Sequence, residues 1–379
     1  MALGIYVHLP FCPYLCPYCD FAKWTHRASA AARYLRALDA EIESVAPRQA
    51  ATIFLGGGTP NTYDAGTIAA LVGRLRNRFP LERGEQEITI ELNAELVAKG
   101  DFEIYRAAGI TRVSIGVQSF DRDEIRRLGR RHTPDDVERA VRAARQAGMR
   151  AVSVDLIFAV PGQSVQSWRR SIAAAVALGV DHISTYGLTI EEGTPFAARR
   201  AVEPGYFLDD AAEAQLYAAA MDDLEAAGFE QYEISNFARP GYRCEHNENY
   251  WANGEYLGLG VGAASYDGGV RGTHTRDLGA YVAAALAREA IPGESESLEP
   301  GRRAGEAIML ALRTSQGLRF AEFKERYGID AAAKYEPVIR RYVFEGLLEC
   351  DERGVRLSRR GRFFANDICA AFLEAPAFV

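Results

Sequence analysis

Short apolar runs alternate with amphipathic stretches along the first half of the chain. Six runs rich in Val, Ile and Leu are predicted to be buried strands: LGIYVHL, ATIFLGG, EITIELN, RVSIGVQ, AVSVDLIF and HISTYGLTI. Between them, RYLRALDAEIES and PDDVERAVRAARQAG have helical periodicity; the first places Tyr34, Leu35, Leu38 and Ile42 on one face, and the second starts well with Pro134 and two aspartates. The pattern predicts repeated β–α units around a parallel sheet.

Polar positions near the ends of these runs distinguish two folds that share the pattern. Glu91, Gln118 and Asp155 lie toward the carboxyl ends of three successive predicted strands, and GGGTP follows another strand directly. A barrel gathers such residues at one mouth, whereas a doubly wound open sheet concentrates its site at a single switch point. The α/β pattern therefore favours a (β/α) barrel, complete or partial.

The alternation ends after about residue 200. A helix is expected in DDAAEAQLYAAAMDDLEAAG, and an aromatic, glycine-rich segment follows from Tyr232 to Gly272. From about Gly301, the helical stretches GEAIMLALRT, FAEFKERYG and YEPVIRRYVFEGLLEC precede ERGVRLSRRG, which is expected to form a two-stranded wing. The expected divisions are a barrel over residues 1–200, a barrel extension with the aromatic segment over 201–300, and a winged-helix-like C-terminal domain over 301–379.

Composition and charge exclude several classes of protein. The 379 residues are 48% hydrophobic and 25% charged, which is the ordinary balance of a globular enzyme. A net charge of −7 argues against a nucleic-acid binder that works by bulk electrostatics. No apolar run has the length of a membrane span, and MALGIYVHLP has neither a basic leader nor a long apolar core, so a cytoplasmic location is expected.

Three closely spaced cysteines are the strongest chemical signal in the sequence. Cys12, Cys16 and Cys19 form C-x3-C-x2-C directly after the first predicted strand, and Pro13 and Pro17 keep the loop out of a helix. Thiolates with this close spacing hold iron–sulfur clusters. Three of them leave one iron of a four-iron cluster open, and S-adenosylmethionine (SAM) can bind that iron through its amino and carboxylate groups.

Other uses of the cysteines are less favoured. Structural zinc needs a complete set of four ligands, and Cys244, Cys350 and Cys369 stand alone in the sequence. A heme bound by the thiolate of a Cys-Pro pair would leave two neighbouring cysteines idle. Disulfides are not expected in a cytosolic chain of this length.

With its C-x3-C-x2-C loop, the sequence resembles the radical SAM superfamily. The resemblance implies a [4Fe-4S] cluster on Cys12, Cys16 and Cys19, with SAM on the fourth iron, where an electron from the cluster could cleave the sulfonium. Longer motifs are similar to the oxygen-independent coproporphyrinogen III oxidase-like branch and, within it, to the HemW-like heme chaperones; they are YVHLPFCPYLCPYCDF, FLGGGTPN, SIGVQSFDRDEIRRLGRRHT, VDLIFAVPGQS and YEISNFARPGYRCEHNENYW. This resemblance spans nearly the whole chain and implies a partial (β/α)6 barrel followed by a small C-terminal domain.

Carried across by position, the resemblance implies a set of SAM contacts. They are Tyr6, Gly57, Gly58, Thr59, Glu91, Gln118, Arg130 and Asp155. Structural alternatives stay open: the glycine run also fits a tight turn after a strand, and each polar strand residue also fits a satisfied core position. Arg130 could pair with the SAM carboxylate or cap a helix, and His8 and His132 are expected to support or cap rather than to be ligands.

The segment HNENYW, from His246 to Trp251, matches a motif associated with heme binding in the chaperone branch. Imidazole is a common axial ligand of heme iron, and Tyr250 and Trp251 could pack on the macrocycle, so His246 is the expected heme ligand. The structural alternative is a loop histidine that is hydrogen-bonded to backbone near buried aromatic residues. Other candidate ligands in the segment are Tyr242, Cys244 and Tyr256.

Three features separate this sequence from the families that it resembles. The oxidases carry a further cysteine where this chain has Phe21, and they carry an extended N-terminal segment where only eleven residues precede Cys12 here. Many relatives have a histidine where this chain has Ala264. The nearby GLGVG run looks like a dinucleotide motif, but no helical pattern follows it, so we expect close backbone packing instead.

The resemblance implies a heme chaperone that binds heme and transfers it to apo-hemoproteins such as respiratory cytochromes. Whether SAM is cleaved stays open, as does enzyme activity. The alternative is an oxidative decarboxylase of the coproporphyrinogen III oxidase type or another radical SAM enzyme acting on a tetrapyrrole, and a methyltransferase is more remote. Expected partners are heme, the recipient proteins, an electron donor, a second copy of the chain and at most a transient membrane contact, but no nucleic acid.

Overall fold

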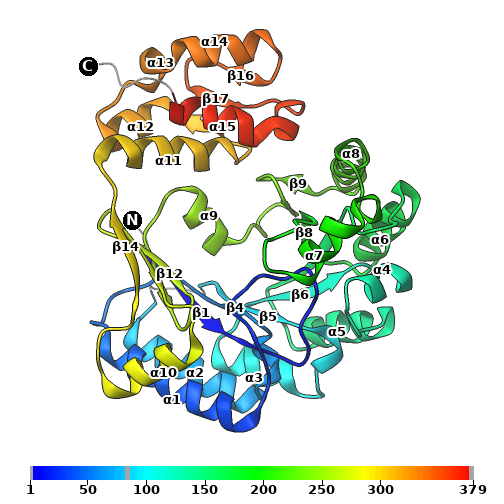
Figure 1. The fold of residues 1–379 in the computed structure, drawn as a ribbon, viewed down its shortest axis with the longest axis vertical. Coiled ribbons are helices and arrows are strands. Elements are labelled where there is room, and N and C mark those ends of the chain that lie inside the picture. The colour runs from blue at the N-terminus through cyan, green and yellow to red at the C-terminus, as the bar shows by residue number, and fades with distance from the viewer. Residues whose placement is uncertain (1–2, 82–85, 375–379) are drawn as a thin grey trace.

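A curved, mostly parallel sheet forms the centre of the molecule. The computed structural model describes residues 3–81 and 86–374, and within them the strand order is β14-β13-β12-β11-β1-β4-β5-β6-β7-β8-β10-β9 (Figure 1). Its parallel centre consists of β1 (Gly4–Leu9), β4 (Thr52–Gly57), β5 (Ile88–Leu92), β6 (Arg112–Gln118), β7 (Ala151–Phe158) and β8 (His182–Gly187). These are the six predicted strands, and they lie side by side in chain order. That order belongs to a barrel and not to a doubly wound sheet, so the predicted partial (β/α) barrel is confirmed.

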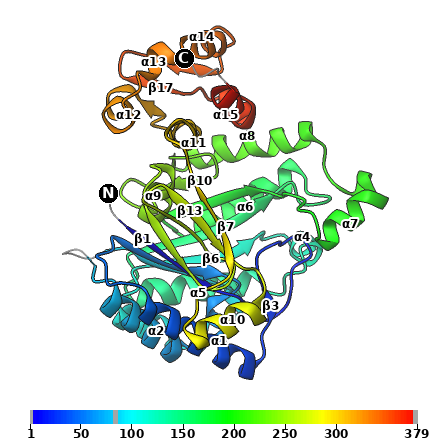
Figure 2. The ribbon, with the colours of Figure 1, turned by 60° about the vertical axis from the view of Figure 1, so that its left-hand side comes forward.

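Helices between the strands cover the outer side of the sheet (Figures 1 and 2). They include α1 (Ala28–Ser44), α2 (Ala65–Arg78), α3 (Asp101–Ala108), α4 (Arg122–Arg127), α5 (Pro134–Gln146) and α6 (Val165–Ala177). Tyr34 and Leu38 of α1 are fully buried, as their helical spacing predicts, whereas Leu35 is half-buried at the margin of that face. Helix α5 begins at Pro134, where Thr133 and the third helical residue cap each other reciprocally.

Later segments extend both edges of the same sheet. Strand β11 (Tyr256–Leu259) pairs in parallel with β1 and is followed by the antiparallel strands β12 (Ala264–Asp267), β13 (Val270–His274) and β14 (Gly293–Ser297). At the opposite edge, β10 (Asn236–Ala238) pairs with β8 and with β9 (Glu230–Gln231). The remaining helices of this part are α7 (Pro195–Val202), α8 (Asp210–Ala226), α9 (Glu245–Trp251) and α10 (Leu278–Ala287).

The GLGVG run has the structure expected from the sequence, whereas the HNENYW segment does not. The GLGVG run is a place of close packing, as expected: Gly260 has a φ of +105°, and a Cβ there would lie 2.4 Å from the Tyr34 hydroxyl. The HNENYW segment forms helix α9 rather than a loop. The loop in the structural alternative for His246 is therefore wrong, although its buried aromatic surroundings are present.

A second hydrophobic cluster lies in the C-terminal part, at the top of Figure 1. It is built by α11 (Pro300–Leu312), α12 (Phe320–Tyr327), α13 (Ala331–Lys334), α14 (Glu336–Phe344) and α15 (Ala365–Glu374), with a sheet of β15 (Leu318–Arg319), β17 (Gly354–Leu357) and β16 (Leu348–Cys350). The predicted wing is displaced. Its first strand, β16, falls within the stretch expected to be helical, because Gly346 at a φ of +71° reverses the chain after α14.

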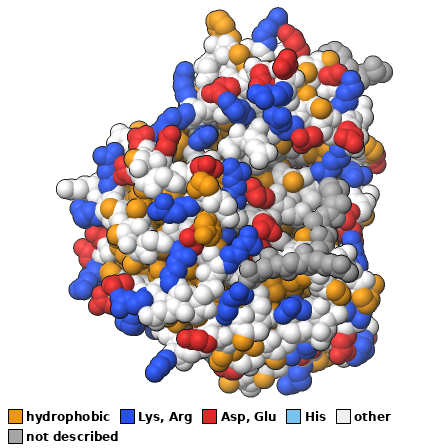
Figure 3. All heavy atoms as spheres, turned by 180° about the vertical axis from the view of Figure 1, so that it is seen from behind, with side chains coloured by type: hydrophobic (Ala, Val, Ile, Leu, Met, Phe, Trp, Pro, Cys, Tyr) orange, Lys and Arg blue, Asp and Glu red, His pale blue; other side chains and the backbone are white. Residues whose placement is uncertain are grey.

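The molecular surface carries both signs of charge. Figure 3 shows Lys and Arg side chains interspersed with Asp and Glu over the face opposite to that of Figure 1. Within residues 3–81 and 86–374, no helix combines the length and the apolar character needed to cross a membrane. The division of the chain near residues 200 and 300 stays a prediction, and its outer ends at residues 1–2 and 375–379 lie outside the described residues.

Candidate functional site

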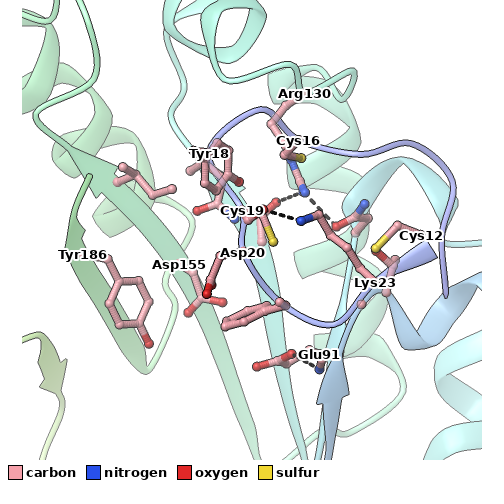
Figure 4. Close-up of a pocket in the computed structure, with 18 of the residues that line it drawn as sticks. Cys12, Cys16, Tyr18, Cys19, Asp20, Lys23, Glu91, Arg130, Asp155 and Tyr186 are labelled. Carbon is pink, nitrogen blue, oxygen red and sulfur yellow. Dashed lines mark hydrogen bonds between the residues drawn. The ribbon is translucent and has the colours of Figure 1, made fainter. Parts of the chain in front are cut away.

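The three cysteines lie on the long loop between β1 and α1. Two short parallel strands, β2 (Phe11–Cys12) and β3 (Trp24–Thr25), pair at the base of this loop and hold its ends together. Cys12, Cys16 and Cys19 all line one cavity of about 350 Å³ at the carboxyl ends of the central strands (Figure 4). The loop therefore places all three thiols at the mouth of the barrel, where the polar strand residues also end.

The glycine run after β4 packs against the start of this loop. Gly57 has a φ of +105°, and a Cβ on it would lie 2.4 Å from the ring of His8. A Cβ on Gly58 would lie 2.7 Å from the backbone carbon of Pro10. The Gly57 amide also donates a hydrogen bond of 3.1 Å to Glu91. Both glycines line the cavity, but the protein's own atoms already require them, as in the tight-turn alternative.

Two carboxylates face the same cavity from neighbouring parts of the sheet. Burial and the nearby Asp155 raise the pKa of Glu91 from 4.5 to about 7, although the Gly57 amide opposes the shift. Burial likewise raises the pKa of Asp155, whose oxygens accept hydrogen bonds of 3.1 Å from the Ser114 hydroxyl. Such a pair favours a bound group that carries positive charge or several hydroxyl donors, because either would stabilise the ionised form.

Arg130 supplies the positive charge on the opposite wall. One of its terminal nitrogens donates to the side-chain oxygen of Asn93 at 2.8 Å and to the carbonyl of Gly116 at 2.6 Å. Its Nε is buried and has no hydrogen-bond partner among the described residues. Within that part of the chain, the arrangement leaves one buried guanidinium donor for an acceptor such as a carboxylate.

Gln118 is the last residue of β6 and lies in a left-handed backbone conformation, with a φ of +64°. This conformation is uncommon for a residue with a side chain. The register between β6 and β7 shifts at the same place, between Gly116 and Gln118. Gln118 lines the cavity together with the buried Thr59, so both predicted contacts lie at its wall.

The surroundings of Cys12 and Cys19 favour the protonated thiols in the absence of a metal. Burial raises the pKa of Cys12 to about 11, and burial also raises the pKa of Cys19. Lys23 opposes both shifts, and its ammonium donates to the backbone carbonyl of Cys19. Loading the loop with a thiolate-bound metal group should therefore release protons.

The spacing of the cysteines fits a cluster better than a single ion. Among the described residues, no three Cys, His, Asp or Glu side chains are gathered closely enough to hold one metal ion. In a four-iron cluster each thiolate binds a different iron, so three sulfurs spread around one cavity suit that group. The predicted ligands Cys12, Cys16 and Cys19 therefore fit a four-iron cluster because they are three thiol donors around one cavity.

Several cavity residues escape the sequence analysis. They include Tyr18, Lys23, Asn93, Ser114 and Tyr186. For Ser114 a signal is present, because it alternates with Gly116 and Gln118 at the two-residue period of one strand face. Asn93 directly follows β5, and polar residues at the carboxyl ends of parallel strands are expected to face the site, so this position also carries a signal.

Tyr6 does not reach the cysteine cavity. Its hydroxyl donates to Nδ1 of His8 at 3.0 Å, because Nε2 of that ring donates to the carbonyl of Ala22 at 2.7 Å. Tyr6 lines a neighbouring cavity instead. His8 thus supports the loop as expected, whereas His132 is buried away from the lining of the cysteine cavity and its supporting or capping role stays a prediction.

His246 lies in the protein interior, with 1% of its surface exposed. One ring nitrogen is 2.7 Å from the Thr52 hydroxyl and the other is 2.8 Å from the Tyr250 hydroxyl. The ring stacks on Phe54 with centroids 5.2 Å apart, and burial lowers the pKa of His246 to about 3. The imidazole is therefore neutral and uses both nitrogens within the protein. Of the alternative ligands, Cys244 is also buried and donates to Glu87.

Comparison with family models gives two matches. Residues 6–175 match the radical SAM superfamily, and residues 298–364 match the HemN C-terminal domain. The first match contains the three cysteines and the strand-end residues of the cavity.

Curated relatives match over nearly the full chain. The heme chaperone HemW of Bacillus subtilis is 32% identical and the alignment covers 97% of this chain and 98% of that protein. HemW of Mycobacterium tuberculosis is 36% identical over 98% of this chain and 94% of its own. A mitochondrial radical S-adenosyl methionine domain-containing protein 1 of Danio rerio is 32% identical over 98% of this chain and 86% of its own.

Among solved structures, the coproporphyrinogen III oxidase HemN of Escherichia coli has the same fold. Its TM-score is 0.86 over 98% of this chain and 90% of that one, at 24% sequence identity. At this identity the likeness shows the architecture alone.

Proposed function

This chain belongs to the HemW family of the radical SAM superfamily, and from that premise we propose that it is a heme chaperone, which binds heme and delivers it to apo-hemoproteins. The observation that carries the proposal is the match to heme chaperones over both the barrel and the C-terminal part. Respiratory cytochromes are the recipients that we propose.

Family membership implies a [4Fe-4S] cluster and SAM, and the cysteine cavity suits both. We propose Cys12, Cys16 and Cys19 as the cluster ligands. The cluster would supply an open iron for SAM and an electron for its reductive cleavage. We further propose that Glu91 and Asp155 bind the amino and hydroxyl groups of SAM. Arg130 would donate a hydrogen bond from its unpaired Nε–H to the SAM carboxylate.

The other proposed SAM contacts contribute shape rather than charge. Gly57, Gly58 and Thr59 form the floor of the cavity, and Gln118 forms part of its wall. Tyr6 would act from outside the cavity through His8, whose ring holds the loop carbonyl of Ala22. The partners that we propose are an electron donor for the cluster and a second copy of the chain. We also propose a cytoplasmic location, with at most a transient membrane contact.

A second candidate function is oxidative decarboxylation of a tetrapyrrole. It is favoured by the fold shared with HemN and by the intact SAM-type cavity. Phe21 argues against it, because the further cysteine of the oxidase motif is absent at that position. Another radical SAM reaction on a tetrapyrrole belongs to the same candidate.

A heme titration under anaerobic conditions tests the proposal. The chain is reconstituted with iron and sulfide and titrated with heme while the visible spectrum is recorded, and the loaded protein is then mixed with an apo-cytochrome. A chaperone should bind one heme per chain, pass it to the apo-cytochrome and form no vinyl groups on coproporphyrinogen III. Absence of saturable heme binding together with SAM consumption on the porphyrinogen would replace the chaperone by the decarboxylase.

The Cys16→Ala variant tests the proposed cluster ligands independently of heme binding. It should lose the four-iron absorbance after reconstitution, because only two of the three thiolates remain. Retention of a full cluster in this variant would contradict the three-thiolate site.

A further inference from the structure

A second cavity lies beside the cysteine cavity, between the extended edge of the sheet and the C-terminal part. Its volume is about 700 Å³, within the range of sites for small molecules and cofactors. Strands β1, β11, β12 and β13 and helix α9 form one side, and α11 closes the other; Figure 2 shows α11 above α9 and β13. We call it the tyrosine cavity, after Tyr6, Tyr250, Tyr256 and Tyr266 in its wall.

The walls of the tyrosine cavity suit a flat aromatic molecule. The rings of Tyr250 and Tyr256 meet edge to face with centroids 4.6 Å apart, and Tyr266 follows at 6.4 Å from Tyr256. From α11, Met309 and Leu310 present apolar side chains to the same space. Aromatic rings on one side and flexible aliphatic groups on the other are suited to packing against a planar macrocycle.

Charged groups lie at two places in the lining. Arg271 pairs with Glu306 at 2.6 Å, and Arg276 reaches the backbone carbonyl of Asp20 and lies 3.8 Å from its carboxylate. The Arg276 side chain is 62% exposed, so its guanidinium can turn toward a ligand. Heme carries two carboxylates at one edge, and an arginine at the rim can donate hydrogen bonds to either of them.

The hydroxyl groups of the four tyrosines differ in their availability. Tyr6 donates to His8, and Tyr250 is paired with His246. Tyr266 is only 4% exposed. The Tyr256 hydroxyl, in contrast, has no hydrogen-bond partner within the described part of the chain and belongs to a half-buried residue.

We propose that the tyrosine cavity is the heme site of this chain and that Tyr256, rather than His246, binds the ferric iron. The inference rests on the proposed heme-chaperone function and names the site for it. On binding, the Tyr256 hydroxyl loses its proton to solvent and its oxygen forms the bond to iron, with no change in oxidation state. Tyrosinate is an established axial ligand of heme.

The surroundings of Tyr256 do not by themselves favour its ionisation. Burial raises the pKa of Tyr256, the positive charge of Arg271 opposes this rise, and the negative charge of Glu306 adds to it. The iron itself supplies the remaining drive for deprotonation, as metals do for their protein ligands. His246 would have to give up either Thr52 or Tyr250 before iron could reach it.

The Tyr256→Phe variant tests the iron ligand. Ferric heme is titrated into the wild-type chain and the variant, and the phenolate-to-iron charge-transfer absorption and the dissociation constant are recorded. The variant should lose that absorption and bind heme about tenfold more weakly. The matched control is Tyr206→Phe, because Tyr206 packs under Arg199 outside the cavity. It should behave as the wild type.

Two outcomes would overturn the assignment, and each is distinct from failure of the chaperone function. If wild type and Tyr256→Phe bind heme with the same spectrum, Tyr256 is not the ligand. If His246→Gln changes the spectrum and Tyr256→Phe does not, the iron lies at His246. Absence of heme binding by the wild type would instead contradict the proposed function itself.

The charged rim is tested with Arg276→Gln and a second form of the ligand. The variant should weaken binding of heme by about tenfold but leave binding of heme dimethyl ester unchanged, because the ester has no carboxylates for Arg276 to contact. Equal weakening for both ligands, or none for either, would contradict the proposed orientation of the macrocycle.

Discussion

Glu91 illustrates how much its surroundings change a single side chain. It is held against the Gly57 amide, faces Asp155 across the cavity, and has its pKa raised to about 7. In the unfolded chain it titrates at its ordinary value of 4.5. Between these two values the folded protein binds the extra proton, so the contribution of Glu91 to stability is present below pH 4.5 and is lost as the pH rises through about 7.

We therefore expect Glu91→Gln to flatten part of the pH dependence of stability. In the wild type, this one group lowers the free energy of unfolding by on the order of 3 kcal/mol between pH 4.5 and pH 8. Urea unfolding of the SAM-free chain across that range measures the difference between wild type and variant. The control is Glu294→Gln, a solvent-exposed glutamate on β14. An equal slope in wild type and Glu91→Gln would contradict the assigned shift.

At this scale the sequence predicts chemistry better than position. The cysteine spacing and the carboxylates at strand ends are local signals, and the structure brings all of these residues to one cavity. The positions of the Tyr6 and His246 side chains are harder to predict, because the side of the sheet on which a ring packs depends on partners far away in the sequence. For His246 those partners are Thr52 and Phe54 on β4.

The loop between β1 and α1 and the turn after β4 work as one element. The Gly58 amide donates to the carbonyl of Leu9 at 2.9 Å, and the Thr59 amide donates to that of Phe11 at the same distance. The ring of His8 occupies the space next to Gly57. The cysteine loop is therefore positioned by a glycine turn that has no side chains to interfere with it.

Gly57→Ala should damage this element. The added methyl group would meet the His8 ring, and alanine at a φ of +105° is strained, so we expect a loss of about 2 kcal/mol in the free energy of unfolding. Cluster loading, measured by absorbance after reconstitution, should also fall. The control is Gly73→Ala on α2, where a Cβ meets no atom within 4 Å. Unchanged loading and stability in Gly57→Ala would contradict the coupling of turn and loop.

The six parallel strands of the barrel are predicted to within a few residues, because each is a continuous apolar run between turn signals. The C-terminal wing is predicted less well. The run GLLEC continues the apolar helical pattern, and only the left-handed Gly346 shows where the chain leaves the helix. Strands β9 and β10, at one end of the sheet, are too short to give a periodic signal at all.

Within the described residues, one large hydrophobic cluster lies around the barrel and another in the C-terminal part, beside a small third cluster of Leu128, Ile157 and Val160. The cysteine cavity is lined entirely by residues before position 192, whereas the tyrosine cavity also needs α11. We propose that the C-terminal domain begins near residue 300 and that its first helix serves as one wall of the heme site. Cluster assembly and heme binding should then be separable by mutation.

Met309→Glu tests this separation. A carboxylate introduced into the apolar wall of the tyrosine cavity should weaken heme binding by at least about tenfold, while the cluster absorbance after reconstitution stays at the wild-type level. Phe344→Glu is the matched control, because Phe344 lies on α14 of the same domain and is 92% exposed. If Met309→Glu loses the cluster as well as heme binding, or if it binds heme normally, cluster assembly and heme binding are not separable in the proposed way.

Asp20 and Phe21 line both cavities, so a single stretch of the cysteine loop is a wall common to the two. Any rearrangement of this wall when one cavity fills must alter the energy of filling the other. Thermodynamic linkage then makes the effect mutual: if bound SAM changes the affinity for heme by some factor, heme changes the affinity for SAM by the same factor. Binding of heme and binding of SAM would then be energetically coupled through this common wall, which includes the exposed ring of Phe21.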